Sequence, residues 1–443
     1  MAQTEARTYT GTQDLHAFIE TQAEPEWMLA LRRRALEEFN EMQWPTTSDE
    51  EWRRSDISNY DFDEYSYQTV PDDVAARLPG EGIGALLDFV DGQCVRRGIK
   101  PEIESQGVVF ESLRTLLQRE AANHDGSVHE LSRRLESLIG RAIERSDNRV
   151  TTWHYASWTH GIVLYVPKHT RISEPFVVDF LEQGDGSYSA PLIAVIVEED
   201  AEASIIIRTH GKAEGEVLLN AGTAVTVGDN AAFRIAAVNT LNIDSSVFSH
   251  GFSWIGRDAH VHHGSHMFGG MFTKARFDGI LEGAGSDVML DGLYFPHEDQ
   301  HIDLRTVQVH NGPQANSRTF YKGAVRDEAH SIYQGMIRVA HEAIGTDAYL
   351  TNNNLLLNDG ARADSIPGLQ ISTDDVRCSH GSTTGRLEES ELFYLESRGY
   401  PRQEAETVLI QGFFEEVIAR APESIREEIR EIVAERALEE YEE

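Results

Sequence analysis

A short motif recurs through the middle of this 443-residue chain and constrains its fold more than any other feature. Gly-x-x-Ala stands ahead of a short strand-like run at Gly228, Gly256, Gly312, Gly345 and Gly360. Gly228 and Gly256 lie 28 positions apart, and two further steps of that length reach Gly312. A fixed interval between turns is typical of a chain that winds in coils or folds into a sandwich of short strands.

The runs between these turns are short, and they are either apolar throughout or alternate between apolar and polar residues. They are residues 161–167, 191–199, 203–210, 223–230, 287–295, 330–339 and 352–360. No helical crossover sequence separates them, which argues against a sheet built from βαβ units. Small alanines after the turns favour stacked coils, in which like positions lie on one another. We therefore predict a mainly β chain with a β-helix core over residues 151–385. A β-sandwich is the alternative, because the pattern does not decide between parallel and antiparallel strands.

Both flanks of the predicted core are typical of helix. Residues 1–150 are polar and contain amphipathic stretches at 24–42, 109–123 and 128–145. Residues 386–443 return to helical periodicity, with further stretches at 387–399, 400–421 and 422–443. The sequence thus predicts an N-terminal helical region, a β-helix core and a C-terminal helical domain.

The formal net charge of −35 excludes several kinds of partner. A nucleic-acid-binding chain needs the opposite sign, and the longest purely apolar run, residues 192–197, is too short to cross a bilayer. The acids are spread along the chain, which favours a solvated surface suited to high salt and a salt-loving source. No basic stretch leads into an apolar one near the start, so we expect a cytoplasmic location. Cys94 and Cys378 are the two cysteines, and we expect free thiols.

Cys378 and His380 form the first candidate site. They stand two positions apart in the stretch DDVRCSHGSTTG. On a strand, side chains at i and i+2 point to the same face, with Cα atoms roughly 6.5–7 Å apart. A thiolate and an imidazole at that separation can converge on one metal or cluster, and this ligand pair suits zinc or an iron–sulfur species. Ser379 points to the other face, so a Ser379–His380 catalytic pair is geometrically poor.

Two histidine-rich segments are further candidates for metal binding. The first contains His260, His262, His263 and His266 within seven residues, and the second contains His297, His301, Asp303 and His310. In the second segment, His301 and Asp303 are again i and i+2, so a two-histidine, one-carboxylate iron site is conceivable. In both segments a purely structural role for the histidines is the stronger interpretation.

Familiar catalytic motifs are absent from the sequence. There is no Walker phosphate loop, no Gly-x-Ser-x-Gly elbow, no His-Glu-x-x-His and no Cys-x-x-Cys. These absences weaken a hydrolase or nucleotide-binding role. A cytosolic β-helix metalloenzyme that uses His297, His301 and Asp303 remains an alternative.

Several stretches resemble the SufB/SufD family of the SUF iron–sulfur cluster assembly machinery. They are EPEWMLALRRRALEEF, EEWRRSDI, HGIVLYVPK, GLYFPHEDQHID, SRTFYKGAVRDEAHSIYQGMIRV and the long segment that begins NNNLLLNDG and contains RCSHGSTTG. The resemblance covers nearly the whole chain. The Cys-Ser-His-Gly core of the last segment resembles the SufD branch of the family more than the SufB branch.

The resemblance implies a right-handed parallel β-helix flanked by helical regions. It also implies a non-catalytic scaffold that pairs edge to edge with SufB and docks the ATPase SufC through its C-terminal helices. A transient iron–sulfur cluster or iron would bind at the SufB–SufD seam, with Cys378 and His380 as this chain's ligands. The isolated chain is expected to hold no tightly bound cluster or iron. An isolated chain could also pair with itself through the same edge.

Sulfur acceptance is implied to belong to SufB. The predicted β-helix has no second thiol, since Cys94 lies in the N-terminal region. A SufB-like scaffold that accepts sulfur directly is the remaining alternative.

Overall fold

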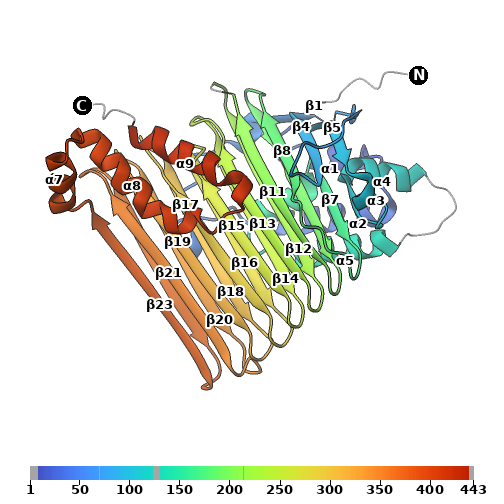
Figure 1. The fold of residues 1–443 in the computed structure, drawn as a ribbon. Coiled ribbons are helices and arrows are strands. Elements are labelled where there is room, and N and C mark those ends of the chain that lie inside the picture. Colours follow the sequence, from blue (N-terminus) through green and yellow to red (C-terminus); the bar gives the residue numbers. More distant parts are fainter. Residues whose placement is uncertain (1–7, 69, 123–129, 213, 439–443) are drawn as a thin grey trace.

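A long solenoid with helices on both of its faces forms the molecule (Figure 1). The computed structural model describes residues 8–68, 70–122, 130–212 and 214–438. In this part of the chain the strands form two large sheets, which we call sheet A and sheet B.

Sheet A forms one wall of the solenoid. In spatial order it contains β1 (Thr8–Thr10), β2 (Ser66–Gln68), β9 (Ser187–Ser189), β12 (Val217–Val227), β14 (Ser246–Ile255), β16 (Phe272–Leu281), β18 (His301–His310), β20 (His330–Val339) and β22 (Arg362–Ile371). Near its start, β10 (Pro191–Val197) pairs with β12 and with β7 (His160–Val166), and β6 (Val109–Ser112) pairs with β7.

Sheet B forms the opposite wall. In spatial order it contains β23 (Val376–Arg386), β21 (Thr346–Leu356), β19 (Asn316–Val325), β17 (Asp287–Tyr294), β15 (His260–Met267), β13 (Ala232–Thr240), β11 (Glu202–Gly211), β8 (Phe176–Glu182), β4 (Ala85–Val90), β5 (Gln93–Ile99) and β3 (Ala75–Ala76).

Strands from β10 onward alternate between the two sheets, and each pairs in parallel with the strand one coil later. Ala232 on β13 lies opposite His260 on β15, which is the 28-residue step seen between the first two motif glycines. His260 in turn lies opposite Asp287 on β17. The prediction of a parallel β-helix core is therefore confirmed, and the sandwich alternative is wrong.

The motif glycines lie in the turns between the sheets. Gly228, Gly256, Gly312 and Gly345 precede β13, β15, β19 and β21, where the chain passes from sheet A to sheet B. Gly360 precedes β22 and lies at the opposite edge, where the chain returns to sheet A. The repeat in the sequence thus follows mainly one edge of the solenoid.

Close stacking of these turns explains why glycine recurs there. The main-chain N–H of Gly228 donates to the carbonyl oxygen of Val197 at 2.8 Å. A Cβ at Gly228 would lie 2.7 Å from the main-chain nitrogen of Glu199, which leaves no room for a side chain. The alanines that follow Gly228, Gly256, Gly312 and Gly345 enter the interior and are 0–1% exposed: Ala231, Ala259, Ala315 and Ala348.

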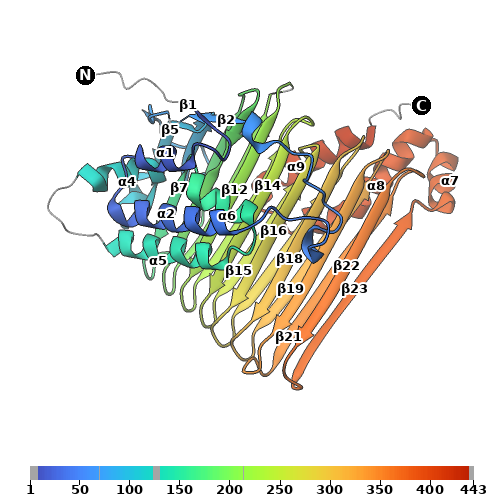
Figure 2. The same ribbon diagram turned by 180° about the vertical axis from the view of Figure 1, so that it is seen from behind.

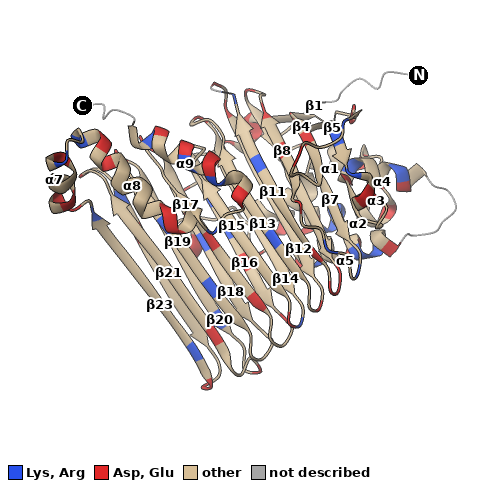
Figure 3. Cartoon of the chain, viewed as in Figure 1, with Lys and Arg blue, Asp and Glu red and all other residues tan. Residues whose placement is uncertain are grey.

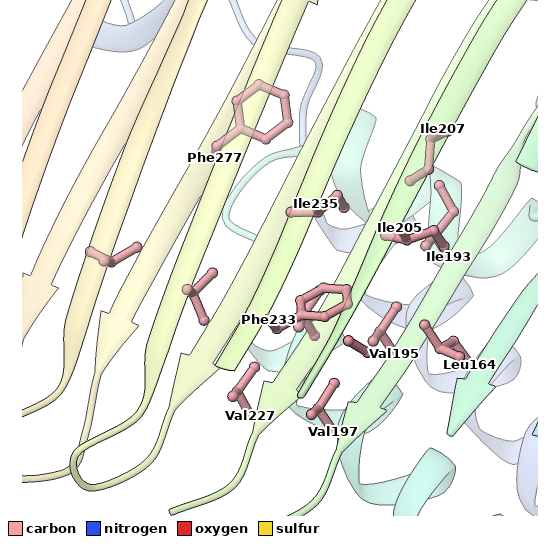
Figure 4. Packing of buried hydrophobic residues seen from close by; sticks show 14 of the residues in the cluster. Leu164, Ile193, Val195, Val197, Ile205, Ile207, Val227, Phe233, Ile235 and Phe277 are labelled. Atoms are coloured by element: carbon pink, nitrogen blue, oxygen red, sulfur yellow. The ribbon is translucent and has the colours of Figure 1, made fainter. Parts of the chain in front are cut away.

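The main hydrophobic core lies between the two sheets (Figure 4). Its side chains come from alternate positions of each strand, because successive strand residues point to opposite faces. On β11, Ile205 and Ile207 point into this core, while Ile206 points outward to a second cluster beneath the C-terminal helices. A strand that is buried on both faces has apolar residues at successive positions. This explains the continuous apolar sequence of β10.

Helices cover the outer faces of both sheets. They are α1 (Leu15–Glu20), α2 (Glu26–Glu41), α3 (Pro101–Glu104), α4 (Leu113–Ala122), α5 (Glu130–Arg145), α6 (Arg149–Ser157), α7 (Glu389–Ser397), α8 (Arg402–Ile418) and α9 (Glu423–Leu438), with 3-10 turns at η1 (Glu50–Trp52) and η2 (Phe62–Glu64). Helices α2, α5 and α6 lie against the start of sheet A (Figure 2), and their apolar side chains pack on β10, β12 and β14. Helices α8 and α9 lie across sheet B (Figure 1).

The N-terminal region differs in part from the predicted helical one. Strands β4 and β5 form an antiparallel hairpin, and β4 pairs in parallel with β8, so the hairpin extends sheet B. The expected boundary at residue 150 falls inside α6, whereas the expected end of the core at 385 nearly matches the end of β23. Residues 85–99 join the sheet because β8 presents a free edge, which no local pattern reveals. No helix among the described residues is long and apolar enough to cross a membrane.

Charged residues are distributed along the strands, turns and helices (Figure 3). We expect the melting temperature to rise steeply when KCl is increased from about 0.1 M to about 1 M, because the screening length falls from about 10 Å to about 3 Å. Shorter screening weakens the repulsion within a chain of net charge −35. Thermal unfolding followed by circular dichroism measures this effect. A melting temperature that stays constant across the series would contradict it.

Candidate functional site at the open end of the solenoid

The last coil leaves one end of the β-helix open. Strand β22 pairs only with β20, and β23 pairs only with β21, within the residues that the structure describes. Leu369 and Ile371 on β22 lie over the buried Ile337 and Val339, yet they are 39% and 40% exposed. This end of the solenoid therefore presents unpaired strand edges together with core side chains that no further coil covers. Another strand can pair with such edges and extend the sheets.

Cys378 and His380 lie in the interior column of this last coil. Cys378 lies over Ala348 and His380 over Leu350, and both of these underlying residues are buried in the core. Cys378 is half-buried and packs against the core, whereas His380 is exposed. The prediction that the two side chains share one strand face is confirmed, since Ser379 lies over the 41% exposed Tyr349 on the other face.

The interior column continues past His380 with polar residues that the sequence analysis missed. Ser382 and Thr384 lie over Asn352 and Asn354. Asn352 is fully buried and donates to the hydroxyl of Tyr294, which itself donates to Asn354. Asparagines two positions apart in a predicted strand are the signal that could have indicated a polar interior near this end.

Burial raises the pKa of the Cys378 thiol above its ordinary value, and the Asp347 carboxylate acts in the same direction. The thiol is therefore protonated at neutral pH in the isolated chain, and a metal would have to displace that proton. Among the described residues, no three side chains of His, Cys, Asp or Glu come together in a way that could hold a metal ion. Cys378 and His380 could offer at most two ligands, so a metal bound there would need others from beyond the described residues of this chain.

The four histidines of β15 are divided among three environments. His260 and His262 share the outer face. The Nδ1 of His260 lies 3.7 Å from a carboxylate oxygen of Asp287, and the Nε2 of His262 lies 2.8 Å from one of Asp291. His263 is buried beside Phe277 in the interior. His266 is buried and forms a hydrogen bond between its Nδ1 and the carbonyl oxygen of Ala237. These positions support the structural interpretation of the cluster.

His301 and Asp303 lie beneath the N-terminal segment. Ser55 donates to the Oδ2 of Asp303 at 2.5 Å, and its Oγ lies 3.1 Å from the Nε2 of His301. The fully buried Asp303 also forms an ion pair with Lys274 and accepts from the side-chain amide of Gln334.

The other two histidines of that segment do not complete a metal site. His310 is buried, and its Nε2 lies 2.8 Å from the hydroxyl of Ser317. Because no three potential ligands come together in the described chain, His297, His301, Asp303 and His310 do not form the two-histidine, one-carboxylate site that the sequence allowed. Asp303 forms an ion pair with Lys274 instead.

Comparison with known proteins identifies the family. Residues 180–413, more than half of the chain, match the model described as "SUF system FeS cluster assembly, SufBD core domain". The chain belongs to the SufBD family. The matched SufBD core runs from within β8 to within α8, so it contains the open end and both of its candidate residues.

Individual SufBD relatives agree with this assignment. An iron–sulfur cluster assembly SufBD family protein of Mycobacterium tuberculosis is 34% identical over 298 residues, which cover 64% of this chain and 72% of the relative. The iron–sulfur cluster assembly protein SufD of Escherichia coli is 34% identical over 52% of this chain and 53% of its own length. SufD of Bacillus subtilis is 23% identical over 95% of this chain and 96% of its own length. The SufBD family resemblance seen in the sequence is thus confirmed.

Proposed function

We propose that this chain is a SufD-type scaffold subunit of an iron–sulfur cluster assembly complex, with no catalytic activity of its own. A SufB partner extends the open end of the solenoid, and the nascent cluster forms between the two chains. The observation that carries the proposal is the position of Cys378 and His380 in the interior column of an uncovered last coil.

The unpaired edges of β22 and β23 support pairing with a second β-helix. Their main-chain groups can continue a parallel ladder, as in other cases of strand addition. Pairing would bury Leu369 and Ile371, as the residues beneath them on β20 are already buried. Burial of apolar surface favours such pairing by about 25 cal/mol for each Å² removed from water.

Two ligands suit an assembly site that must release its product. A thiolate and a neutral imidazole both bind iron, but a cluster needs further ligands. SufB supplies them in this proposal, so the complete site exists only in the pair. A site divided between two chains opens when the chains separate.

The C-terminal helices provide a surface for the SufC ATPase. Phe393 and Tyr394 on α7 are 71% and 56% exposed, although large aromatic side chains of this kind contribute strongly to interfaces. Tyr400 and Val408 add to the exposed apolar surface of this region. The rest of the C-terminal domain is anchored, because Phe414 and Ile429 are buried against sheet B.

His380→Ala tests the cluster site. In a complex reconstituted from this chain, SufB and SufC, we expect bound iron and sulfide to fall by roughly tenfold or more, since loss of even an outer-sphere partner weakens metal sites by that much. Co-elution with SufB should be unchanged, because the exposed imidazole contributes little buried volume. Cys378→Ser should lower cluster loading as strongly if the thiolate binds iron, and more mildly if it is auxiliary.

His341→Ala is the matched control, because His341 is an exposed histidine in the turn after β20. It should load and transfer clusters like the unchanged protein. If His380→Ala pairs with SufB and still transfers clusters to an apo-acceptor at the unchanged rate, the site assignment fails.

The double substitution Phe393→Ala and Tyr394→Ala tests the SufC surface. We expect SufC to bind roughly 30-fold more weakly, which is the effect of losing an interface hot spot of about 2 kcal/mol. Calorimetric titration of SufC into the variant measures this change. Leu78→Ala removes a side chain that is 68% exposed in the N-terminal region and serves as control. Equal SufC affinity for both variants would exclude α7 as the dock.

A SufB-like role is the second candidate, because SufB of Bacillus subtilis matches 93% of this chain at 22% identity, close to the value for SufD. Direct sulfur acceptance distinguishes the two roles. Incubation with a cysteine-persulfide donor, followed by mass spectrometry of alkylated peptides, should leave Cys378 without transferred sulfur in the SufD-type role.

A further inference from the structure

A second group of potential ligands lies at the opposite end of the solenoid, in the first coil. His160 begins β7, Glu182 ends β8 and Ser189 ends β9. Together with the turn of the β4–β5 hairpin at Asp91 and Gly92, they line a cleft of about 330 Å³. Nothing in the proposed scaffold function uses this cleft.

The imidazole of His160 is incompletely bonded. Its side chain is 1% exposed, and its Nδ1 lies 2.9 Å from the hydroxyl oxygen of Thr159. That hydroxyl also accepts the main-chain N–H of Ala190, and it can accept the Nδ1 proton as well. The Nε2 atom then carries a lone pair, and it has no hydrogen-bond partner among the described residues although it is buried. Burial, with Arg114 and His154 nearby, lowers the pKa of His160 to about 3, so the ring is neutral at pH 7.

Glu182 is similarly short of a counter-charge. Its side chain is 3% exposed and accepts one hydrogen bond, from the hydroxyl of Ser189 at 2.7 Å. Among the described residues, the only basic side chain paired with it is His160, whose Nε2 lies 3.9 Å from Oε1. Burial, together with the nearby Asp91 carboxylate, raises the pKa of Glu182 to about 7. An uncompensated buried carboxylate is costly, and natural proteins usually neutralise it with a partner or a metal.

We propose that a divalent transition-metal ion binds between the Nε2 of His160 and the carboxylate of Glu182. Metal–nitrogen and metal–oxygen bonds of about 2.0–2.2 Å span the 3.9 Å gap with a wide angle at the metal. The ion supplies the missing partner to both groups at once. Asp91 and Asp185 on the rim add negative charge, and no lysine or arginine is among the described residues that line the cleft.

The ligand types define the class of metal. One imidazole with carboxylate oxygen favours Fe²⁺, Mn²⁺, Co²⁺ or Zn²⁺ over Mg²⁺ and Ca²⁺, which prefer oxygen alone. Water completes the coordination, and the hydroxyls of Ser187 and Ser189 line the space where that water lies. Two protein ligands hold a metal weakly, so the site exchanges its ion readily.

Titration of the purified full-length chain with Co²⁺, followed by calorimetry and by the visible absorption of the bound ion, tests this proposal. The titration is made in the His380→Ala background, so that the open end contributes no histidine. We expect one site, and at least tenfold weaker binding in both His160→Gln and Glu182→Gln. His169→Gln is the matched control, because His169 forms an exposed pair with Asp200 at 3.2 Å. It should bind Co²⁺ like the parent.

Unchanged Co²⁺ affinity in Glu182→Gln would overturn the proposal. That variant keeps the size of the side chain, so it decides the outcome alone if His160→Gln fails to fold. Binding of methylammonium with the same dependence on Glu182, without binding of Co²⁺, would also overturn it and would indicate a site for organic cations. This test does not measure cluster loading at the open end. The proposed metal site and the proposed scaffold function can therefore be confirmed or contradicted independently.

Discussion

Lowering the pH from 7 towards 4 is expected to unfold this protein cooperatively, because the fold buries histidines in their neutral form. Burial lowers the pKa to about 3 for His154 and His160, and to about 4 for His263 and His310. All four are 5% exposed or less. His250 and His266 are shifted in the same direction by the same cause.

The sign of the effect follows from these directions. An unfolded histidine has a pKa of about 6.5, so between that pH and the lower folded value the unfolded chain binds more protons. The stabilisation is fully present above pH 6.5 and is lost as the pH falls. Four such groups change the free energy of unfolding by roughly 5 kcal/mol per pH unit within that window. Since a whole domain is stable by about 5–15 kcal/mol, two pH units are enough to unfold it.

Two effects oppose this loss and are weaker. Glu182 has a raised pKa of about 7, so its protonation favours the fold as the pH falls. Partial neutralisation of the net charge of −35 also reduces self-repulsion. Comparing variants at one high salt concentration removes both effects from the result, because salt screens the self-repulsion and every variant retains Glu182.

Circular dichroism and tryptophan fluorescence during acid titration measure the midpoint. His310→Gln should move the midpoint to lower pH if the variant folds at neutral pH, because one titrating group is removed. His169→Gln should leave it in place, since His169 is exposed. Retention of native signal at pH 4 in the unchanged protein would contradict the explanation from buried neutral histidines.

Lys274→Met is expected to lower the free energy of unfolding by about 3–5 kcal/mol, the usual consequence of leaving a buried charge unpaired. Asp303 is fully buried and Lys274 is 8% exposed, and the two form an ion pair on the outer face of sheet A. Methionine retains the length of the side chain but not its charge. From the described residues, the carboxylate would keep the hydrogen bonds from Ser55 and Gln334 alone.

The same substitution should loosen the N-terminal segment. The Nζ of Lys274 also donates to the main-chain carbonyl of Glu51, and Ser55 bonds to Asp303. We therefore expect faster proteolysis around residues 50–55, measured alongside urea unfolding.

Two controls separate pairing from other effects. Lys168→Met removes a lysine from an exposed pair with Glu199, and such pairs contribute about 0–1 kcal/mol. The double variant Lys274→Met and Asp303→Asn should recover part of the stability, because it removes the stranded charge as well. If Lys274→Met and Lys168→Met lower the free energy of unfolding equally, the buried ion pair has no special role in stability.

The sequence by itself determined the coils and the shared face of Cys378 and His380. Gly-x-x-Ala marks the stacked turns because main-chain atoms of the neighbouring coil occupy the space that a Cβ would need, as at Gly228. The period of two along a strand assigned Cys378 and His380 to one side without knowledge of the fold. Both features depend on neighbours in the chain, so they can be read locally.

Only the tertiary structure decided which face is the interior and where the solenoid ends. Cys378 and His380 lie in the core column because Ala348 and Leu350 lie beneath them, and they are uncovered because no described strand follows β23 in sheet B. The hairpin of β4 and β5 joins sheet B for a related reason, since it meets the free edge of β8.

The charged and histidine-rich groups were decided in the same way. Asp303 stands beside His301 in the sequence, yet its partners are Lys274 on the neighbouring strand and Ser55 from the N-terminal segment. His160 and Glu182 meet across the first coil and carry no shared motif. Periodicity encodes which way a side chain points, whereas its partner depends on segments that folding brings together from distant parts of the chain.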